Sequence, residues 1–188
     1  MTPQTPSTSR RYSIGAGQFE AEKLPGGLYV TATPIGHLGV VTLRALATMA
    51  AADILLCEDT RTTAKLLERY GIRTRLMAYH EHNAAKVRPA ILRSLGEGQA
   101  IALVSDAGMP LVSDPGYRLV ADCVAHAIPV TAIPGASAVL TALALSGLPT
   151  DRFVFLGFLP TKSGERKKLL KEFMGVQASL IALSILHL

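Results

Sequence analysis

The sequence predicts an α/β protein with a mostly parallel five-stranded sheet and helices on both of its faces. Strand-like and helix-like segments alternate five times between residues 28 and 146, with short connections between them. This alternation is typical of parallel sheets, because each helix carries the chain back to the start of the next strand. Residues 54–57 (ILLC) and 101–104 (IALV) are apolar without alternation. Such runs indicate strands that are covered on both faces.

Each element follows from local patterning. Residues 41–51 place Leu43, Leu46 and Ala47 at helical spacing, and Gly71 and Gly96 are glycines of the kind that end helices. The predicted segments are, in chain order, strand 28–32, helix 41–51, strand 53–57, helix 60–70, strand 75–79, helix 83–95, strand 100–104, helix 116–126, strand 129–133 and helix 136–146.

Short polar side chains and a proline stand before three of these helices. Such residues accept hydrogen bonds from the free amides of the first turn, or tolerate a position without an amide hydrogen. The candidates are Asp59 or Thr60 for helix 60–70, Asn83 for helix 83–95, and Ser113 or Asp114, with Pro115 in the first turn, for helix 116–126.

The chain divides into three parts by composition. Residues 1–23 carry no apolar core segment and are expected to be a flexible N-terminal tail, and residues 24–150 contain the predicted α/β domain. After residue 150 the composition of the sequence changes: residues 152–160 hold three of the five phenylalanines, and a basic stretch follows. Residues 151–188 are too few for an independent core, so they are expected to be the incomplete start of a second α/β domain.

Composition limits the class of protein. With 188 residues, 49% of them hydrophobic, the chain is not disordered as a whole. The net charge of +5 suits an acidic partner such as RNA. Cys57 and Cys123 lie in apolar runs without metal-ligand spacing and are expected to be buried thiols of a reducing compartment. The N-terminus has no export signal, and prolines and glycines interrupt residues 128–149, so we expect a cytoplasmic protein without a membrane span.

Polar or small residues follow every predicted strand. In open α/β sheets ligands bind beyond the carboxyl ends of the strands, so five such loops predict a ligand cleft. The loops are residues 33–39 (TPIGHLG), 58–61 (EDTR), 79–83 (YHEHN), 105–110 (SDAGMP) with 113–116 (SDPG), and 134–137 (PGAS).

Several of these side chains have more than one interpretation. Glu58 lies 22 residues after Gly36, as an acid that binds a ribose would, although Pro34 argues against a dinucleotide turn. Arg61 either pairs with a nearby acid or binds a phosphate. His80 and His82 have metal-binding spacing, but no further ligand cluster accompanies them, so no metal site is predicted.

The run at residues 105–110 is the strongest candidate for ligand binding. Gly108 permits an unusual φ, Pro110 fixes the path of the chain, and Ala107 leaves space beside the backbone. Main-chain N–H and C=O groups can then face a ligand, and Asp106 offers a carboxylate to a cation or an amine.

Six motifs in order resemble the ribosomal RNA small-subunit methyltransferase I family, a branch of the tetrapyrrole methylase superfamily. They are residues 29–36 (YVTATPIG), 58–61 (EDTR), 79–83 (YHEHN), 105–116, 133–138 (IPGASA) and 146–153 (SGLPTDRF), within a similarity that runs from residue 27 to about residue 170. Two departures stand out. His37 replaces an asparagine usual in the family, and the final residues ALSILHL differ from the family's continuation, as a truncation or shifted reading frame would produce.

The resemblance implies a tetrapyrrole-methylase-like fold and S-adenosylmethionine as cofactor, held between two domains. It implies methylation of a ribose 2′-hydroxyl of a cytidine in 16S rRNA of the small ribosomal subunit, and a homodimer where the fold is complete. The cofactor-binding residues that it implies are Asp106, Ala107, Gly108, Pro110, Pro134, Gly135, Ala136 and Ser137. A tetrapyrrole methyltransferase and an inactive remnant remain the alternatives.

Methyl transfer to a hydroxyl requires alignment of the reacting atoms and removal of a proton. The 58–61 and 79–83 loops are expected to face the substrate, because the 105–110 loop is assigned to the cofactor. The candidate catalytic residues are Glu58, Asp59, Arg61 and His80, with Glu81 and His82 as further candidates for the base. RNA contacts are expected at Arg10, Arg11, Arg73, Arg75 and the basic stretch of residues 162–171, although a solvated helix face would give the same pattern in that stretch.

Overall fold

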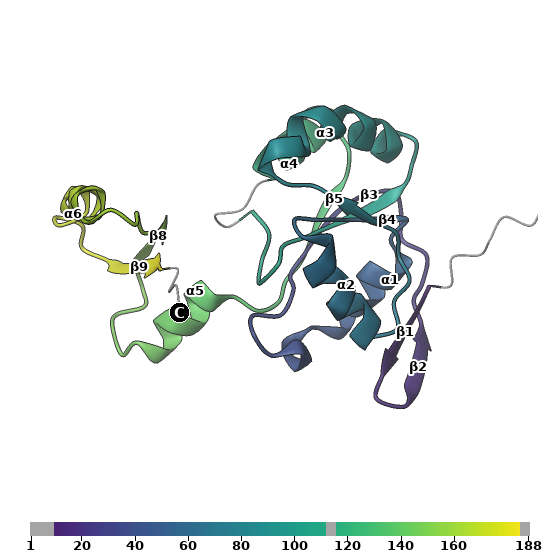
Figure 1. The fold of residues 1–188 in the computed structure, drawn as a ribbon, viewed down its shortest axis with the longest axis horizontal. Coiled ribbons are helices and arrows are strands. Elements are labelled where there is room, and N and C mark those ends of the chain that lie inside the picture. Colours follow the sequence, from purple (N-terminus) through teal and green to yellow (C-terminus); the bar gives the residue numbers. More distant parts are fainter. Residues whose placement is uncertain (1–9, 112–115, 185–188) are drawn as a thin grey trace, which may run out of the picture. The chain divides into compact units, whose positions relative to one another are not determined.

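The computed structural model describes residues 10–111 and 116–184 (Figure 1). By its internal contacts the chain separates into two compact units, Met1–Ala136 and Ser137–Leu188. The elements in chain order are β1 (Arg11–Ile14), β2 (Gly17–Glu20), β3 (Gly27–Thr31), the 3₁₀ turn η1 (Leu38–Val40), α1 (Leu43–Ala51), β4 (Ile54–Cys57), α2 (Thr60–Arg69), β5 (Leu76–Ala78), α3 (Glu81–Gly96), β6 (Ala100–Val104), α4 (Tyr117–Ala125), β7 (Val130–Ile133), α5 (Ala138–Leu145), β8 (Phe153–Phe158), α6 (Ser163–Glu172) and β9 (Ser179–Leu183).

The first unit is built on the predicted five-stranded sheet. Its strands lie in the order β5-β4-β6-β3-β7, and every neighbouring pair is parallel. The central strands β6 and β3 are fully buried along their length. Because all five strands run the same way, the loops after them lie at one edge of the sheet, which is where the ligand cleft is predicted.

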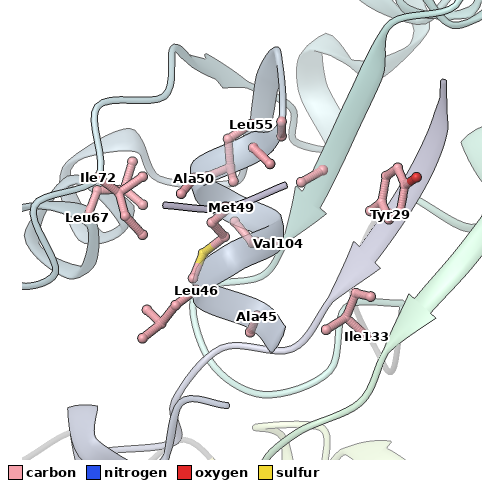
Figure 2. Close-up of a cluster of buried hydrophobic side chains, with 14 of the residues drawn as sticks. Tyr29, Ala45, Leu46, Met49, Ala50, Leu55, Leu67, Ile72, Val104 and Ile133 are labelled. Carbon is pink, nitrogen blue, oxygen red and sulfur yellow. The ribbon is translucent and has the colours of Figure 1, made fainter. Parts of the chain in front are cut away.

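Helices cover both faces of this sheet, as predicted. Successive residues of a strand point to opposite faces. Tyr29 and Leu55 therefore belong to a core shared with α1 and α2, which Figure 2 shows around Met49. Leu28 and Leu56 belong to a second core shared with α3 and α4. Figure 1 shows the same two layers, with α1 and α2 on one side of the strands and α3 and α4 on the other.

Two of the predicted helix caps can be compared with the structure. Asp59 caps α2, as one of the two interpretations held. The prediction for α3 is wrong, because the helix begins at Glu81 and not after Asn83. Asn83 lies inside the first turn, where its Oδ1 accepts a hydrogen bond from the His80 amide at 2.9 Å. The side chain thus satisfies the free amide from within the helix, which lets the helix start earlier. The caps predicted at Ser113 or Asp114, with Pro115, lie outside the described residues.

Part of the expected N-terminal tail is structured. Residues 1–9 lie outside the described residues, but β1 and β2 form an antiparallel hairpin. The rings of Tyr12 and Phe19 stack across it with centroids 5.4 Å apart, and Tyr12 also packs against the core beneath α1. A flexible tail over residues 1–23 is therefore the wrong description of residues 11–20. These strands are too short and too polar for periodicity to reveal them, and packing on the domain holds them.

The second unit starts earlier than the boundary predicted near residue 150. Helix α5 packs its Val139 and Leu143 on Ile181 of β9, and so belongs with the later elements. The unit contains two parallel strands, β8 and β9, connected through α6. Much of its apolar surface is exposed, including Leu145 and Met174, which are 82% and 79% exposed. Among the described residues of both units, no helix is long and apolar enough to cross a membrane.

Both cysteines are buried as free thiols, which allows a prediction. Burial is the main cause that raises the pKa of each thiol, and for Cys123 it reaches about 11. Because the thiolate is the reactive form, we expect neither thiol to react with a disulfide reagent at pH 8 in the native protein, and both to react after unfolding in urea. Rapid labelling of the native chain would contradict the burial of these side chains.

Candidate active site

The site begins where β3 and β6 end side by side. The Thr33 amide donates to the Gly108 carbonyl at 2.8 Å, and the Gly108 amide donates to the Thr33 carbonyl at 3.2 Å. The Ser105 hydroxyl also donates to the Gly108 carbonyl at 3.1 Å, and the Thr33 hydroxyl donates to the Ser105 carbonyl at 3.0 Å. These four bonds hold the 105–110 bend against the end of β3. The main-chain groups of Gly108 are therefore engaged by the protein itself.

Gly108 has the conformation that the sequence predicts. Its φ is +83°, a region that side chains rarely adopt, and a Cβ there would lie 3.3 Å from the side chain of Ile35. The bend thus turns back on the domain at Gly108, while Asp106 and Ala107 before it are exposed. The part of the bend that can meet a ligand is Asp106–Ala107.

A cleft of about 170 Å³ opens beside this bend, entirely within the first unit. It lies where the loops after β3 and β6 meet the first turns of α2. Its lining residues are Thr33, Pro34, Gly36, Leu38, Thr62, Thr63, Leu66, Ser105, Asp106 and Ala107. The lining is mostly small or hydroxyl-bearing, so backbone groups, hydroxyl groups and the Asp106 carboxylate are the polar contacts it offers to a ligand.

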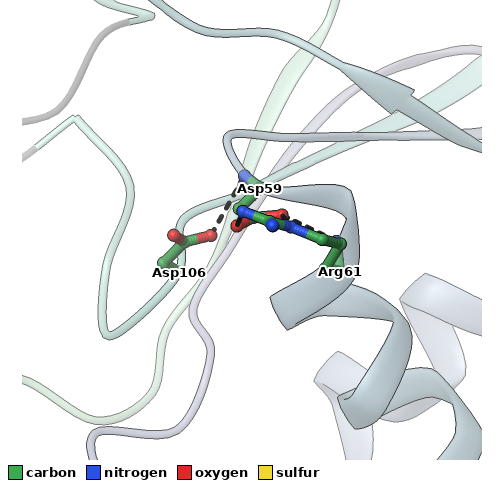
Figure 3. Close-up of polar contacts among 3 residues, drawn as sticks. All are labelled: Asp59, Arg61 and Asp106. Atoms are coloured by element: carbon green, nitrogen blue, oxygen red, sulfur yellow. Dashed lines mark hydrogen bonds and ion pairs between the residues drawn. The ribbon is translucent and has the colours of Figure 1, made fainter.

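Asp59, Arg61 and Asp106 form a polar group at the edge of this cleft (Figure 3). The Asp59 amide donates to Asp106 Oδ1 at 3.2 Å, which joins the loop after β4 to the loop after β6. Asp59 Oδ1 accepts from the Arg61 amide at 2.8 Å and caps α2. The Arg61 guanidinium donates to both carboxylate oxygens of Asp59, at 3.1 and 2.8 Å. Of the two interpretations of Arg61, pairing with an acid is the one that this structure contains.

This pair gives Asp59 an unusual acidity. Hydrogen bonds from the Arg61 side chain and amide lower its pKa to about 2. Because the folded-state pKa lies below the ordinary value of 3.8, the contribution of Asp59 to stability is present above about pH 3.8 and is lost as the pH falls through about 2. We expect the Asp59 carboxyl carbon to titrate near pH 2 by NMR. Arg61→Ala should move the midpoint toward the ordinary value, whereas a midpoint near 4 in the unaltered chain would show that the pair does not form in solution.

The other candidate catalytic side chains, Glu58 and His80, are not among the described residues that line the cleft. Glu58 follows β4 directly and is exposed. His80 stands between β5 and α3 and is half-buried. Its Nδ1 atom is buried, without a hydrogen-bond partner among the described residues, and its ring lies edge-on to that of His82, with centroids 6.0 Å apart. Across residues 10–111 and 116–184, no group of three His, Cys, Asp or Glu side chains is arranged to hold a metal ion.

The remaining predicted cofactor residues follow β7. Pro134 and Gly135 are exposed, and Ala136 is half-buried. The Ala136 carbonyl approaches the bend, because a Cβ on Gly108 would lie 3.6 Å from it. Ser137 begins the second unit, where its hydroxyl accepts from the Leu140 amide at 3.3 Å and caps α5. Pro110 is buried beyond the bend.

Several cleft residues are absent from the set predicted from sequence. Thr33, Thr62, Thr63 and Ser105 contribute much of the lining. Thr62 and Thr63 belong to the first turn of the predicted helix 60–70. That turn directly follows the strand-end loop 58–61, and this position in the sequence could have identified both residues as candidates for the lining. His37 is the residue that departs from the family pattern, and its Nδ1 atom accepts a hydrogen bond from the Gly39 amide at 3.1 Å. An asparagine side chain offers a similar acceptor, so the local turn is retained.

Curated relatives are named consistently. The chain is 55% identical to "Ribosomal RNA small subunit methyltransferase I" of Mesorhizobium japonicum over 89% of this chain and 57% of the relative. It is 47% identical to the protein of the same name from Escherichia coli O157:H7, over 89% of this chain and 58% of that one. The chain thus spans a little more than half the length of these relatives.

Solved structures with the same fold are more distant in sequence. The structure of diphthine synthase matches with a TM-score of 0.66 at 16% identity, over 85% of this chain and 64% of that one. That of uroporphyrin-III-C-methyltransferase from Thermus thermophilus matches with a TM-score of 0.57 at 20% identity, over 86% and 69%. Both share the fold predicted here. The family model for tetrapyrrole (corrin/porphyrin) methylases matches residues 27–187, and the chain therefore belongs to that family.

Proposed function

We propose that this protein transfers a methyl group from S-adenosylmethionine to a ribose 2′-hydroxyl of a cytidine in 16S rRNA of the small ribosomal subunit, in the cytoplasm. The observation that carries the proposal is the shared name of its relatives at 47–55% identity. The part of this chain that aligns with these relatives includes the residues that form the cleft at the strand ends. The exposed Asp106–Ala107 segment could bind a ligand through main-chain groups and a carboxylate, which supports the proposal.

The residues of the cleft fit part of a nucleoside-containing methyl donor. Ala107 and Gly36 leave backbone accessible, and Thr62 and Ser105 place hydroxyl-bearing residues in the lining. At about 170 Å³ the cleft is smaller than the ~300 Å³ that usually encloses a whole ligand of that size, so we propose that it holds one portion of the donor. Asp106 is positioned to accept hydrogen bonds from an amine or a hydroxyl of that portion, while Pro134, Gly135 and Ala136 would contact the rest.

Bound S-adenosylmethionine supplies a methyl group on a sulfonium, which is already electrophilic. The chain must then hold the ribose hydroxyl in line and accept its proton. Asp59 is poorly suited to this because a carboxylate with a pKa of about 2 is a weak base, and its oxygens are occupied by Arg61. We propose Glu58 as the proton acceptor, with His80 as the alternative. Asp59 and Arg61 would position the loop, through the bond between the Asp59 amide and Asp106.

A homodimer is part of the proposal. The second unit exposes Leu140, Leu145 and Met174 to solvent, at 55%, 82% and 79%. Monomeric proteins rarely leave many large apolar side chains exposed together, so such a surface favours association. The dissociation of the purified chain on dilution, followed by sedimentation velocity, would measure this directly.

Two measurements test the function. Calorimetric titration with S-adenosylmethionine should give saturable binding at one site per chain, and Asp106→Ala should weaken it. Transfer of labelled methyl groups to small ribosomal subunits that lack the modification should then label a ribose and not a base. Labelling of a porphyrin-type ring in place of the RNA would support the small-molecule branch of the family. The lack of any donor binding would contradict the proposal for this chain.

A further inference from the structure

A second groove, of about 280 Å³, lies in the first unit and shares no lining residue with the cleft at the strand ends. It runs between one face of the β1–β2 hairpin and the loop that connects α2 to β5. Its lining residues are Arg11, Ser13, Gln18, Gly71 and Arg73. The volume is several times the ~30 Å³ that a water occupies in the liquid, so the groove has room for a phosphate group.

The groove is strongly basic. Arg11 and Arg73 are both exposed, and within the described part of the chain neither forms an ion pair. None of the described residues that line the groove is acidic. Glu20 stands opposite Arg11 in the register of the hairpin, but among the described residues no ion pair joins the two side chains. Two guanidinium groups facing the same space favour an anion with several oxygens.

The groove is held by main-chain contacts. The Ser13 amide donates to the Tyr70 carbonyl at 2.7 Å, which fixes the hairpin to the end of α2. The opposite face of the hairpin carries the stacked rings of Tyr12 and Phe19. The hairpin is thus apolar on one face and polar on the other. Its polar face, with Ser13 and Gln18, is turned toward the groove, where both side chains can donate hydrogen bonds.

Tyr70 also connects the groove to the cleft. Its carbonyl holds the hairpin, and its hydroxyl donates to the carbonyl of Leu38 at 2.9 Å. Leu38 lines the cleft at the strand ends. A single buried residue therefore bonds to both walls, and the two sites keep a fixed separation within the first unit.

We propose that this groove binds the phosphodiester backbone of the RNA substrate. Arg11 and Arg73 contact phosphate oxygens, and Ser13 and Gln18 donate to neighbouring oxygens of the backbone. Contacts of this kind set the position of a nucleic acid without reading its bases. The assignment of RNA as the ligand rests on the proposed function. The groove would then anchor the RNA at a set distance from the nucleotide that enters the cleft.

The test measures RNA binding by the 188-residue chain with a fluorescently labelled RNA stem-loop of mixed sequence, across a salt series. The double variant Arg11→Ala, Arg73→Ala should lose affinity by about tenfold or more. The slope of log affinity against log salt should become shallower by about 1.4 to 1.8, since each of the two phosphate contacts contributes about 0.7 to 0.9. Arg11→Lys, Arg73→Lys should keep most of the salt slope while losing affinity, because lysine retains the charge without the paired donors.

The double variant Lys86→Ala, Arg93→Ala is the matched control: it also removes two positive charges, from exposed sites on α3, on the other face of the sheet. It should leave both affinity and salt slope unchanged. Circular dichroism and donor binding, measured on every variant, report whether the fold and the cleft are intact. The proposal would be overturned if the Arg11→Ala, Arg73→Ala variant kept the RNA affinity and the salt slope of the unaltered chain. It would also be overturned if the unaltered chain bound inorganic phosphate but did not bind RNA. A chain that binds RNA through the two arginines but fails to bind the methyl donor would refute the proposed function and support the groove.

Discussion

Replacement of Ala107 by phenylalanine is expected to weaken methyl-donor binding by roughly tenfold to a hundredfold without unfolding the chain. Ala107 is exposed and lines the cleft, so a ring at this position has access to the cleft and takes up part of its 170 Å³. Forcing a ligand past an added side chain costs about 1–3 kcal/mol, which corresponds to a loss of affinity on the order of 10² at the upper end. The effect on stability should be small, because exposed side chains away from the core usually change it by less than about 0.5 kcal/mol.

Calorimetry with S-adenosylmethionine measures the first effect and urea denaturation the second. The matched control is Ala121→Phe, an exposed alanine of α4 on the opposite face of the sheet. It adds the same ring and should leave donor affinity as it is. Equal affinity in the two variants would mean that the donor binds away from the Asp106–Ala107 segment, and the assignment of this bend would have to be abandoned.

The parts of the fold that sequence predicts well are those with strong local signals. The apolar runs of β4 and β6 revealed the inner strands of the five-stranded sheet, because strands that are buried on both faces are apolar without alternation. The hairpin at residues 11–20 was not predicted, because each of its strands has only four residues and its stability comes from the packing of Tyr12 on the domain. Tertiary contacts of this kind leave no periodicity in the sequence.

The same limit applies to the site. Sequence identified the strand-end loops, since parallel strands bring their carboxyl ends together whatever the side chains are. The sequence could not assign a separate role to each polar residue of those loops. The bond from the Asp59 amide to Asp106 joins residues 47 positions apart, and the Arg61 guanidinium lies on Asp59 instead of facing outward for a phosphate. Such pairings depend on side-chain directions, which spacing along the chain does not specify.

Glu58→Gln is expected to reduce the rate of methyl transfer by on the order of 10² to 10⁴ while leaving donor affinity unchanged. Loss of a general base has this magnitude, and the glutamine side chain keeps the size of the glutamate without its ability to accept a proton. The change should appear in kcat and not in the donor KM, because the proton moves only as the methyl group transfers. Single-turnover transfer to unmodified small ribosomal subunits is the measurement, and Glu97→Gln, an exposed glutamate at the end of α3, is the matched control.

Comparison with Asp59→Asn decides which of the two adjacent carboxylates acts as the base. The amide side chain of that variant would still offer an acceptor to the Arg61 amide but would lose the two-oxygen contact with the guanidinium. The substitution should therefore shift the position of the loop, and with it the KM, more than kcat.

If Glu58→Gln turns over at the unaltered rate while His80→Gln does not, the imidazole at the end of β5 is the base. Because the Nδ1 atom of His80 is buried, the ring would have to accept the proton at Nε2. A pH–rate profile of each variant separates these routes, because only the variant that lacks the true base loses the corresponding limb of the profile.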